Sequence, residues 1–131
     1  MRFPYILLTT AYCLAILYIS VTPNPPQPER QFPHMDKAAH FVMYAGMAAV
    51  VAVGLRRSRP DIAPRLLFWA PVAYATAFGA MCEVLQGFVP ERTLSYGDMA
   101  ANAAGALTAQ LVLCGAVWPW SRPAAREPSG G

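Results

Sequence analysis

The sequence predicts an all-α, polytopic membrane protein whose chain crosses the bilayer four times. Hydrophobic residues make up 56% of the 131 residues and charged residues only 13%, whereas charged residues are about a quarter of a typical soluble domain. Four apolar stretches, at 3–21, 38–55, 66–82 and 99–118, each have about the length that a helix needs to cross roughly 30 Å of hydrocarbon. Because a chain in lipid must satisfy its own backbone hydrogen bonds, and no stretch alternates like a membrane strand, each is expected to be a helix.

The first stretch is expected to be a retained helix rather than a cleaved signal peptide. Its apolar part is long for a signal peptide, Arg2 is its only basic residue, and no A-x-A cleavage site follows. The connection 22–33 holds five prolines and is expected to run extended, near polyproline II. We predict one membrane domain over 1–120, and a disordered cytoplasmic tail over 121–131, which lacks apolar periodicity.

The cysteines and the basic residues argue against several classes of function. Cys13, Cys82 and Cys114 each lie inside an apolar stretch, and no two of them form a CxxC pair. An odd count without a spacing pattern argues against a disulfide framework or a thiolate metal site, so these residues are expected to pack as small apolar side chains. No Lys/Arg-rich run interleaved with aromatic residues indicates nucleic acid binding.

The distribution of arginines predicts which helix ends face the cytoplasm. The connection 56–65 carries four arginines and one acid, so the positive-inside rule places it in the cytoplasm. Four crossings then put both termini in the cytoplasm, in agreement with the arginines near both ends of the chain. The connections 22–33 and 86–98 are therefore expected to face outward.

Polar residues gather where three of the predicted helices approach this outer face. At 1.5 Å per residue, His40 lies about 6 Å deeper than Asp36, and Asn102 lies about 6 Å deeper than Asp98. The sequence therefore predicts a polar site at one shallow membrane level, between the second, third and fourth helices. Its candidate ligand-binding residues are Asp36, Lys37, His40, Tyr44, Glu83, Gln86, Arg92, Asp98 and Asn102.

Each of these residues also has a simpler interpretation. Asp36, His40 and Tyr44 share a helix face, where Asp36 could orient the imidazole; alternatively, Asp36 and Lys37 mark the water interface, with Lys37 snorkelling. A carboxylate at the depth of Glu83 indicates function by default, but it could also form a structural ion pair with a cation of a neighbouring helix.

The start of the fourth helix carries two further patterns. "SYGD" is typical of a capping box, in which Ser95 caps the helix and Asp98 returns a hydrogen bond to the Ser95 backbone. "AANAAGA" is a run of small residues that lets another helix approach closely. Asn102, within this run, could either bind a ligand or bridge two helices.

These motifs, in this order, resemble the VanZ-like family of small bacterial integral membrane proteins. The family pattern is D-K-x-x-H-F-x-x-Y, then E-x-x-Q-x-F-x-P-x-R, then S-x-x-D-x-x-x-N-x-x-G, and it covers roughly residues 36–110 here. The resemblance implies four membrane helices in the bacterial cytoplasmic membrane, and the family is named for a protein that confers low-level resistance to the glycopeptide teicoplanin. The matching residues are Asp36, Lys37, His40, Phe41 and Tyr44; Glu83, Gln86, Phe88, Pro90 and Arg92; and Ser95, Asp98, Asn102 and Gly105.

Three classes of function fit these residues. The first is a protein that binds the headgroup of a lipid or a lipid-linked cell-wall precursor, with Lys37, His40 and Arg92 at the phosphate. The second is an enzyme acting on such a lipid, either through acid–base catalysis by Glu83, His40 and Asp98 or through a divalent metal ion. The third is a purely structural polar cluster, with function in a protein partner. The candidate metal ligands are Asp36, His40, Glu83 and Asp98.

Overall fold

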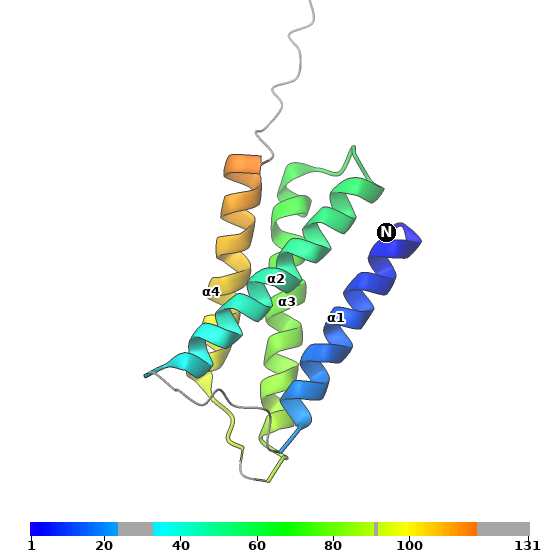
Figure 1. The fold of residues 1–131 in the computed structure, drawn as a ribbon. Helices are drawn as coiled ribbons and strands as arrows, with labels where there is room; N and C mark the ends of the chain where they lie inside the picture. Colours follow the sequence, from blue (N-terminus) through cyan, green and yellow to red (C-terminus); the bar gives the residue numbers. More distant parts are fainter. Residues whose placement is uncertain (24–32, 91, 118–131) are drawn as a thin grey trace, which may run out of the picture.

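A computed structural model describes residues 1–23, 33–90 and 92–117, and within them the chain is all-helical (Figure 1). The helices are α1 (Phe3–Val21), α2 (Met35–Ser58), α3 (Pro64–Gln86) and α4 (Tyr96–Val112), and α4 continues as a π-helical turn, η1 (Leu113–Val117). These four helices are long and apolar enough to cross a membrane, which confirms the predicted fold class and indicates a multi-pass membrane protein. The predicted disordered tail and most of the proline-rich connection lie outside the described residues.

α2 and α3 are longer than the apolar stretches that predicted them, the limits of α1 match, and α4 begins three residues before its predicted stretch. α2 begins at Met35 and ends at Ser58, so it includes Asp36, Lys37 and the first two arginines of the basic connection. α3 begins at Pro64, a residue suited to the first turn of a helix, and ends at Gln86. Hydrophobicity marks only the part of a helix within hydrocarbon, whereas backbone hydrogen bonding continues into the polar boundary.

The four helices place the two kinds of connection at opposite ends of the bundle (Figure 1). The start of α1, the α2–α3 connection and the end of α4 lie at one end, which we call the arginine end because it carries Arg56, Arg57, Arg59 and Arg65. There the backbone N–H of Arg2 donates to Ser58 Oγ at 2.6 Å. The α3–α4 connection and the start of α2 lie at the other end, which we call the polar end.

α2 and α4 run parallel and form the most extensive helix pair. A Cβ atom at Gly105 would overlap the backbone carbonyl of Phe41, so the absence of a side chain there lets the two backbones approach closely. The close approach predicted from the run of small residues is therefore present. The buried core that surrounds this contact consists of Ile16, Tyr44, Met47, Ala48, Val72, Ala75, Cys82 and Ala106.

Polar and apolar side chains are distributed as expected for a protein surrounded by lipid. Large apolar side chains on all four helices are exposed, among them Leu14, Val42, Trp69 and Leu111. Polar side chains, in contrast, are buried between the helices: Glu83, Gln86, Asp98, Asn102 and Gln110. Apolar side chains can face hydrocarbon without cost, whereas polar side chains at the same depth need hydrogen-bonding partners inside the protein.

Candidate functional site at the polar end

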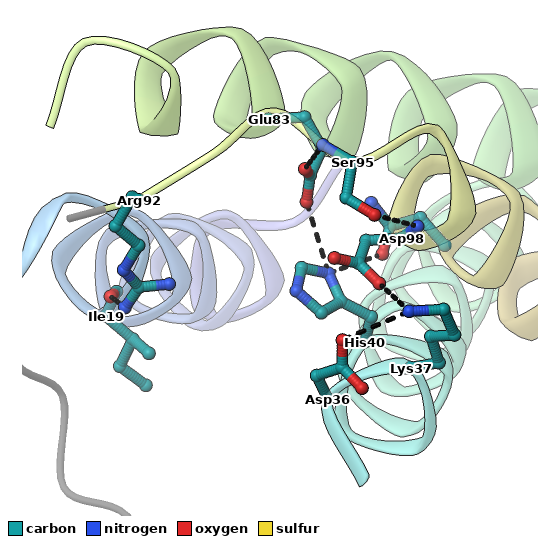
Figure 2. Close-up of polar contacts among 9 residues, drawn as sticks. Ile19, Asp36, Lys37, His40, Glu83, Arg92, Ser95 and Asp98 are labelled. Carbon is teal, nitrogen blue, oxygen red and sulfur yellow. Dashed lines mark hydrogen bonds and ion pairs between the residues drawn. The ribbon is translucent and has the colours of Figure 1, made fainter. Parts of the chain in front are cut away.

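Three helices bring polar side chains together at the polar end (Figure 2). α2 contributes two of them from its first turns, α3 contributes one from its last turn, and α4 contributes its cap and two residues of its first turns. We call this group the polar cluster: Lys37, His40, Glu83, Ser95, Asp98 and Asn102.

His40 lies at the centre of the polar cluster. Its Nδ1 atom is 3.0 Å from Oδ1 of Asn102 and 3.6 Å from Oε1 of Glu83, so one ring nitrogen faces side chains from both α4 and α3. The ring also stacks on Tyr44, one turn further along α2, with centroids 6.2 Å apart. Packing on one side and polar contacts on the other fix the orientation of the imidazole.

Glu83 is fully buried (0% exposed) and joins the end of α3 to the start of α4. Its Oε2 atom accepts a hydrogen bond from the backbone N–H of Ser95 at 3.2 Å, and Ser95 Oγ accepts from the backbone N–H of Asp98 at 3.3 Å. Ser95 therefore caps α4 as predicted, but the prediction that Asp98 returns the second hydrogen bond was wrong. Glu83 makes that bond instead, because the Asp98 carboxylate is turned toward α2.

Lys37 connects the polar cluster to the surface. Its Nζ atom lies 3.4 Å from Oδ1 of Asp98 and 3.1 Å from Oδ2 of Asp36. The Lys37 side chain is 40% exposed and that of Asp36 is 59% exposed. Asp36 thus pairs with Lys37 at the rim, rather than with His40 as its helical spacing suggested, because it lies in the first turn of α2, beyond the level where α3 and α4 supply partners.

Arg92 lies apart from the polar cluster, against the end of α1 (Figure 2). Its Nη2 atom donates to the backbone carbonyls of Ile19 and Thr22, both at 3.1 Å. Carbonyls at a helix C-terminus lack intrahelical partners, and a guanidinium satisfies them well. Because α1 carries no polar motif, nothing in the sequence indicated this role for Arg92.

The two remaining candidates from the sequence, Tyr44 and Gln86, are both buried. Tyr44 packs beside His40, and its hydroxyl has no hydrogen-bond partner among the described residues. Gly79, which the sequence analysis missed, faces both Tyr44 and Asn102, since a Cβ there would come within 3 Å of each. Its position four residues before Glu83, on the same helix face, was the available signal.

The polar cluster has the chemistry of a ligand site. Three of its residues, His40, Glu83 and Asp98, each offer a ligand atom, and these atoms all lie within 4.8 Å of one another. Two buried atoms, Oε1 of Glu83 and Nδ2 of Asn102, have no hydrogen-bond partner in the described part of the chain. The cluster can therefore both donate to and accept from a bound group, and its three ligand atoms could hold a cation.

Known proteins give no guide to the site, which is therefore interpreted from its own contacts. No family model matched the chain, and neither the curated proteins nor the solved structures gave a match. Of the residues chosen from the sequence, the structure brings five into contact at the polar end: Lys37, His40, Glu83, Asp98 and Asn102. It places Asp36 at the rim and Arg92 on α1.

Proposed function

We propose that this chain is a VanZ-like protein of the bacterial cytoplasmic membrane that binds the headgroup of an envelope lipid or a lipid-linked cell-wall precursor. The ordered motifs between residues 36 and 110 support the family, and the four membrane-length helices fit it. The positive-inside rule supports an orientation with the arginine end and both termini in the cytoplasm. The polar end then faces outward, at the level of the outer headgroups.

The observation that carries this proposal is the unmet hydrogen bonding in the polar cluster. Buried polar atoms in proteins almost always have partners, yet Oε1 of Glu83 and Nδ2 of Asn102 have none among the described residues. One unmet acceptor and one unmet donor within the same cluster favour a polar ligand such as a sugar hydroxyl or an amide.

Lys37 supports a negatively charged headgroup as the ligand. Its ammonium group lies at the boundary of the cluster, partly exposed, and its bond to the exposed Asp36 carboxylate is a weak surface pair. A lipid phosphate at the membrane surface could replace Asp36 as the partner of Lys37 while the rest of the headgroup reaches His40 and Asn102. Arg92, whose guanidinium holds the end of α1, contributes indirectly by keeping α1 in place.

A direct binding measurement tests the proposal. Purified protein in detergent is titrated with a polyprenyl phosphate and, separately, with an anionic phospholipid, and binding is followed by native mass spectrometry. We expect Lys37→Ala to weaken polyprenyl phosphate binding about tenfold, since a hydrogen bond to a charged group contributes about 1.5–3 kcal/mol. The matched control is Arg57→Ala, which removes an exposed cation at the arginine end and should leave the affinity unchanged.

Two outcomes of this titration would contradict the proposal. One is equal affinity of the wild type and Lys37→Ala for both lipids, and the other is a larger loss with Arg57→Ala than with Lys37→Ala. Because the family takes its name from teicoplanin resistance, the cellular readout is the teicoplanin susceptibility of bacteria that express the wild type or Lys37→Ala.

A second candidate function is catalysis on the same class of lipid. His40 Nδ1 lies 3.6 Å from Glu83 Oε1, so a substrate bound beside both could give a proton to one of them and receive a proton from the other. An enzyme would release free phosphate or a modified headgroup on incubation with a polyprenyl phosphate or a phospholipid, and Glu83→Gln would abolish the release. Binding without turnover would favour the first candidate.

A further inference from the structure

His40, Glu83 and Asp98 have the spacing of metal ligands. Their ligand atoms lie within 4.8 Å of one another, and the His40 Nδ1 to Glu83 Oε1 distance is 3.6 Å. Around a tetrahedral ion with bonds of about 2.0–2.2 Å, neighbouring ligand atoms are about 3.4 Å apart. The distance between the His40 and Glu83 ligand atoms is thus close to the required value. A movement of up to about 1.4 Å, through side-chain rotation, would place a carboxylate oxygen of Asp98 at the same separation.

The charge of this group favours a divalent cation. Within the described residues, Asp36, Glu83 and Asp98 carry three negative charges and Lys37 one positive charge. Glu83 and Asp98 are the two buried carboxylates of this group, and only Asp98 contacts the Lys37 ammonium group, which it shares with the exposed Asp36. Two negative charges held in a low-dielectric region are costly unless a cation pairs with them, and a single divalent ion would neutralise both.

An unpartnered atom is aimed at the centre of the group. Oε1 of the fully buried Glu83 has no hydrogen-bond partner among the described residues, although its other oxygen is fixed by the Ser95 backbone. Asn102 Oδ1, 3.0 Å from the same imidazole nitrogen, provides a further neutral oxygen donor. These atoms come from α2, α3 and α4 and lie mostly in the protein interior, rather than forming a group of acids on a surface.

We propose that His40 Nδ1, Glu83 Oε1 and a carboxylate oxygen of Asp98 bind one divalent transition-metal ion of the Zn²⁺ or Mn²⁺ type. One imidazole combined with oxygen donors suits these ions better than the all-oxygen preference of Ca²⁺ or the thiolate preference of Cu⁺. A neutral imidazole carries one proton, so binding at Nδ1 requires the tautomer with that proton on Nε2. The proton moves from Nδ1 to Nε2 by exchange with solvent, and the hydrogen bond from Nδ1 to Asn102 Oδ1 is lost. With three protein side chains as ligands, the ion keeps an open coordination position. The proposal does not depend on lipid binding.

Lys37 supplies a property that separates metal binding from lipid binding. Its ammonium group contacts Asp98 at 3.4 Å, so it occupies the carboxylate that the metal would need. Because Lys37 is partly exposed and has Asp36 as an alternative partner, it can release Asp98. Removing its charge should therefore tighten metal binding, whereas the same change weakens binding of a lipid phosphate.

The test is metal binding to the purified full-length chain in detergent, with lipid removed. Zn²⁺ affinity is measured by competition with a chromophoric indicator, and Mn²⁺ binding by electron paramagnetic resonance. We expect one ion per chain, a loss of at least a hundredfold in affinity for Glu83→Gln and for Asp98→Asn, and a two- to fivefold gain for Lys37→Met, an estimate of about the strength of an exposed ion pair. The control Asp61→Asn, which removes an exposed carboxylate at the arginine end, should leave the affinity within about threefold of the wild type.

The gain expected for Lys37→Met keeps the proposal testable if a ligand variant fails to fold, since an unfolded protein does not bind more tightly. Substoichiometric binding to the wild type, or equal affinity of the wild type, Glu83→Gln and Lys37→Met, would overturn the metal site. Metal binding without polyprenyl phosphate binding would overturn only the lipid proposal. The reverse result would overturn only the metal proposal.

Discussion

Gly105 is the position at which a single methyl group should disturb both the fold and the site. In Gly105→Ala, the added Cβ overlaps the backbone carbonyl of Phe41, which cannot move aside as a side chain would. To reach van der Waals contact near 3.5 Å, α2 and α4 must separate locally by more than about 1 Å. Such overpacking typically costs about 1–3 kcal/mol. Because Phe41 adjoins His40 and Gly105 lies one turn after Asn102, the separation also pulls the His40–Asn102 contact apart.

A matched glycine isolates the cost of this overlap. Alanine is favoured over glycine in a helix by about 1 kcal/mol, which partly masks the clash in Gly105→Ala. Gly115→Ala should have a similar gain without a clash, because a Cβ there meets nothing within 4 Å. The difference in unfolding free energy between the two variants should therefore be about 1–3 kcal/mol.

The assay for this pair is reversible unfolding in mixed micelles, with helicity followed by circular dichroism as the denaturing detergent increases. We expect Gly105→Ala to unfold at lower denaturant than Gly115→Ala, and also to lose affinity for whichever ligand the polar cluster binds. If Gly105→Ala were as stable as Gly115→Ala, the backbones of α2 and α4 would not be in contact at this position. The reasoning that links Gly105 to the site would then be refuted.

Substitutions at two further positions, Ser95 and Arg92, test the contacts that hold the polar end together. Ser95→Ala should lower the unfolding free energy by about 1 kcal/mol, because the helix cap is lost. Ser95→Asp should keep the unfolding free energy close to that of the wild type, because aspartate also caps helices. Equal stability of the two variants would argue against the cap. Arg92→Ala should increase hydrogen exchange in the last turn of α1 about fivefold, because Ile19 and Thr22 lose a charged donor that contributes about 1 kcal/mol or more. Unchanged exchange would mean that Arg92 does not hold α1.

The fold class was predictable because lipid imposes a simple rule on the sequence. Long apolar runs can exist in a bilayer only as helices or as strands of a closed barrel, and these runs lacked alternation. The limits of α1 were right because its apolar run and its helix coincide at Phe3–Val21. The limits of α2 fell short because Asp36, Lys37 and Arg56 are helical without being apolar.

The site was predictable at the level of membrane depth but not of individual contacts. Helical rise places His40, Glu83 and Asn102 at one level whatever the packing, and the structure joins them. Contacts also depend on how helices are rotated and on what lies beside each side chain. Asp36 had a nearer partner in Lys37, and Arg92 found the end of α1; neither neighbour is visible from spacing within one helix.

The register between α2 and α4, which aligns the residues of the polar cluster, depends on a residue outside the cluster, Gln110. α2 and α4 run in the same direction and keep their register over the first half of α2, through Lys37–Asp98, His40–Asn102, Phe41–Gly105 and Ala48–Gln110. The fully buried Gln110 donates to the Ala48 carbonyl at 3.2 Å, and a shift of one residue would rotate its amide about 100° away from α2. Since an amide left unpaired in an apolar interior costs about 1–3 kcal/mol, Gln110 specifies the register that aligns His40 with Asn102.

Glu83 is positioned differently from the other ligand atoms. It comes from α3, and its orientation depends on the Ser95 backbone at the end of the α3–α4 connection. The α2–α4 pair is fixed by close packing, whereas this connection carries few buried apolar side chains: Phe88 and Leu94 are both exposed. Parts of a protein with little burial are those that rearrange most readily. Adjustment of the polar cluster to a bound ion or headgroup is therefore expected at Glu83 and in the α3–α4 connection, while the packing of α2 against α4 stays in place.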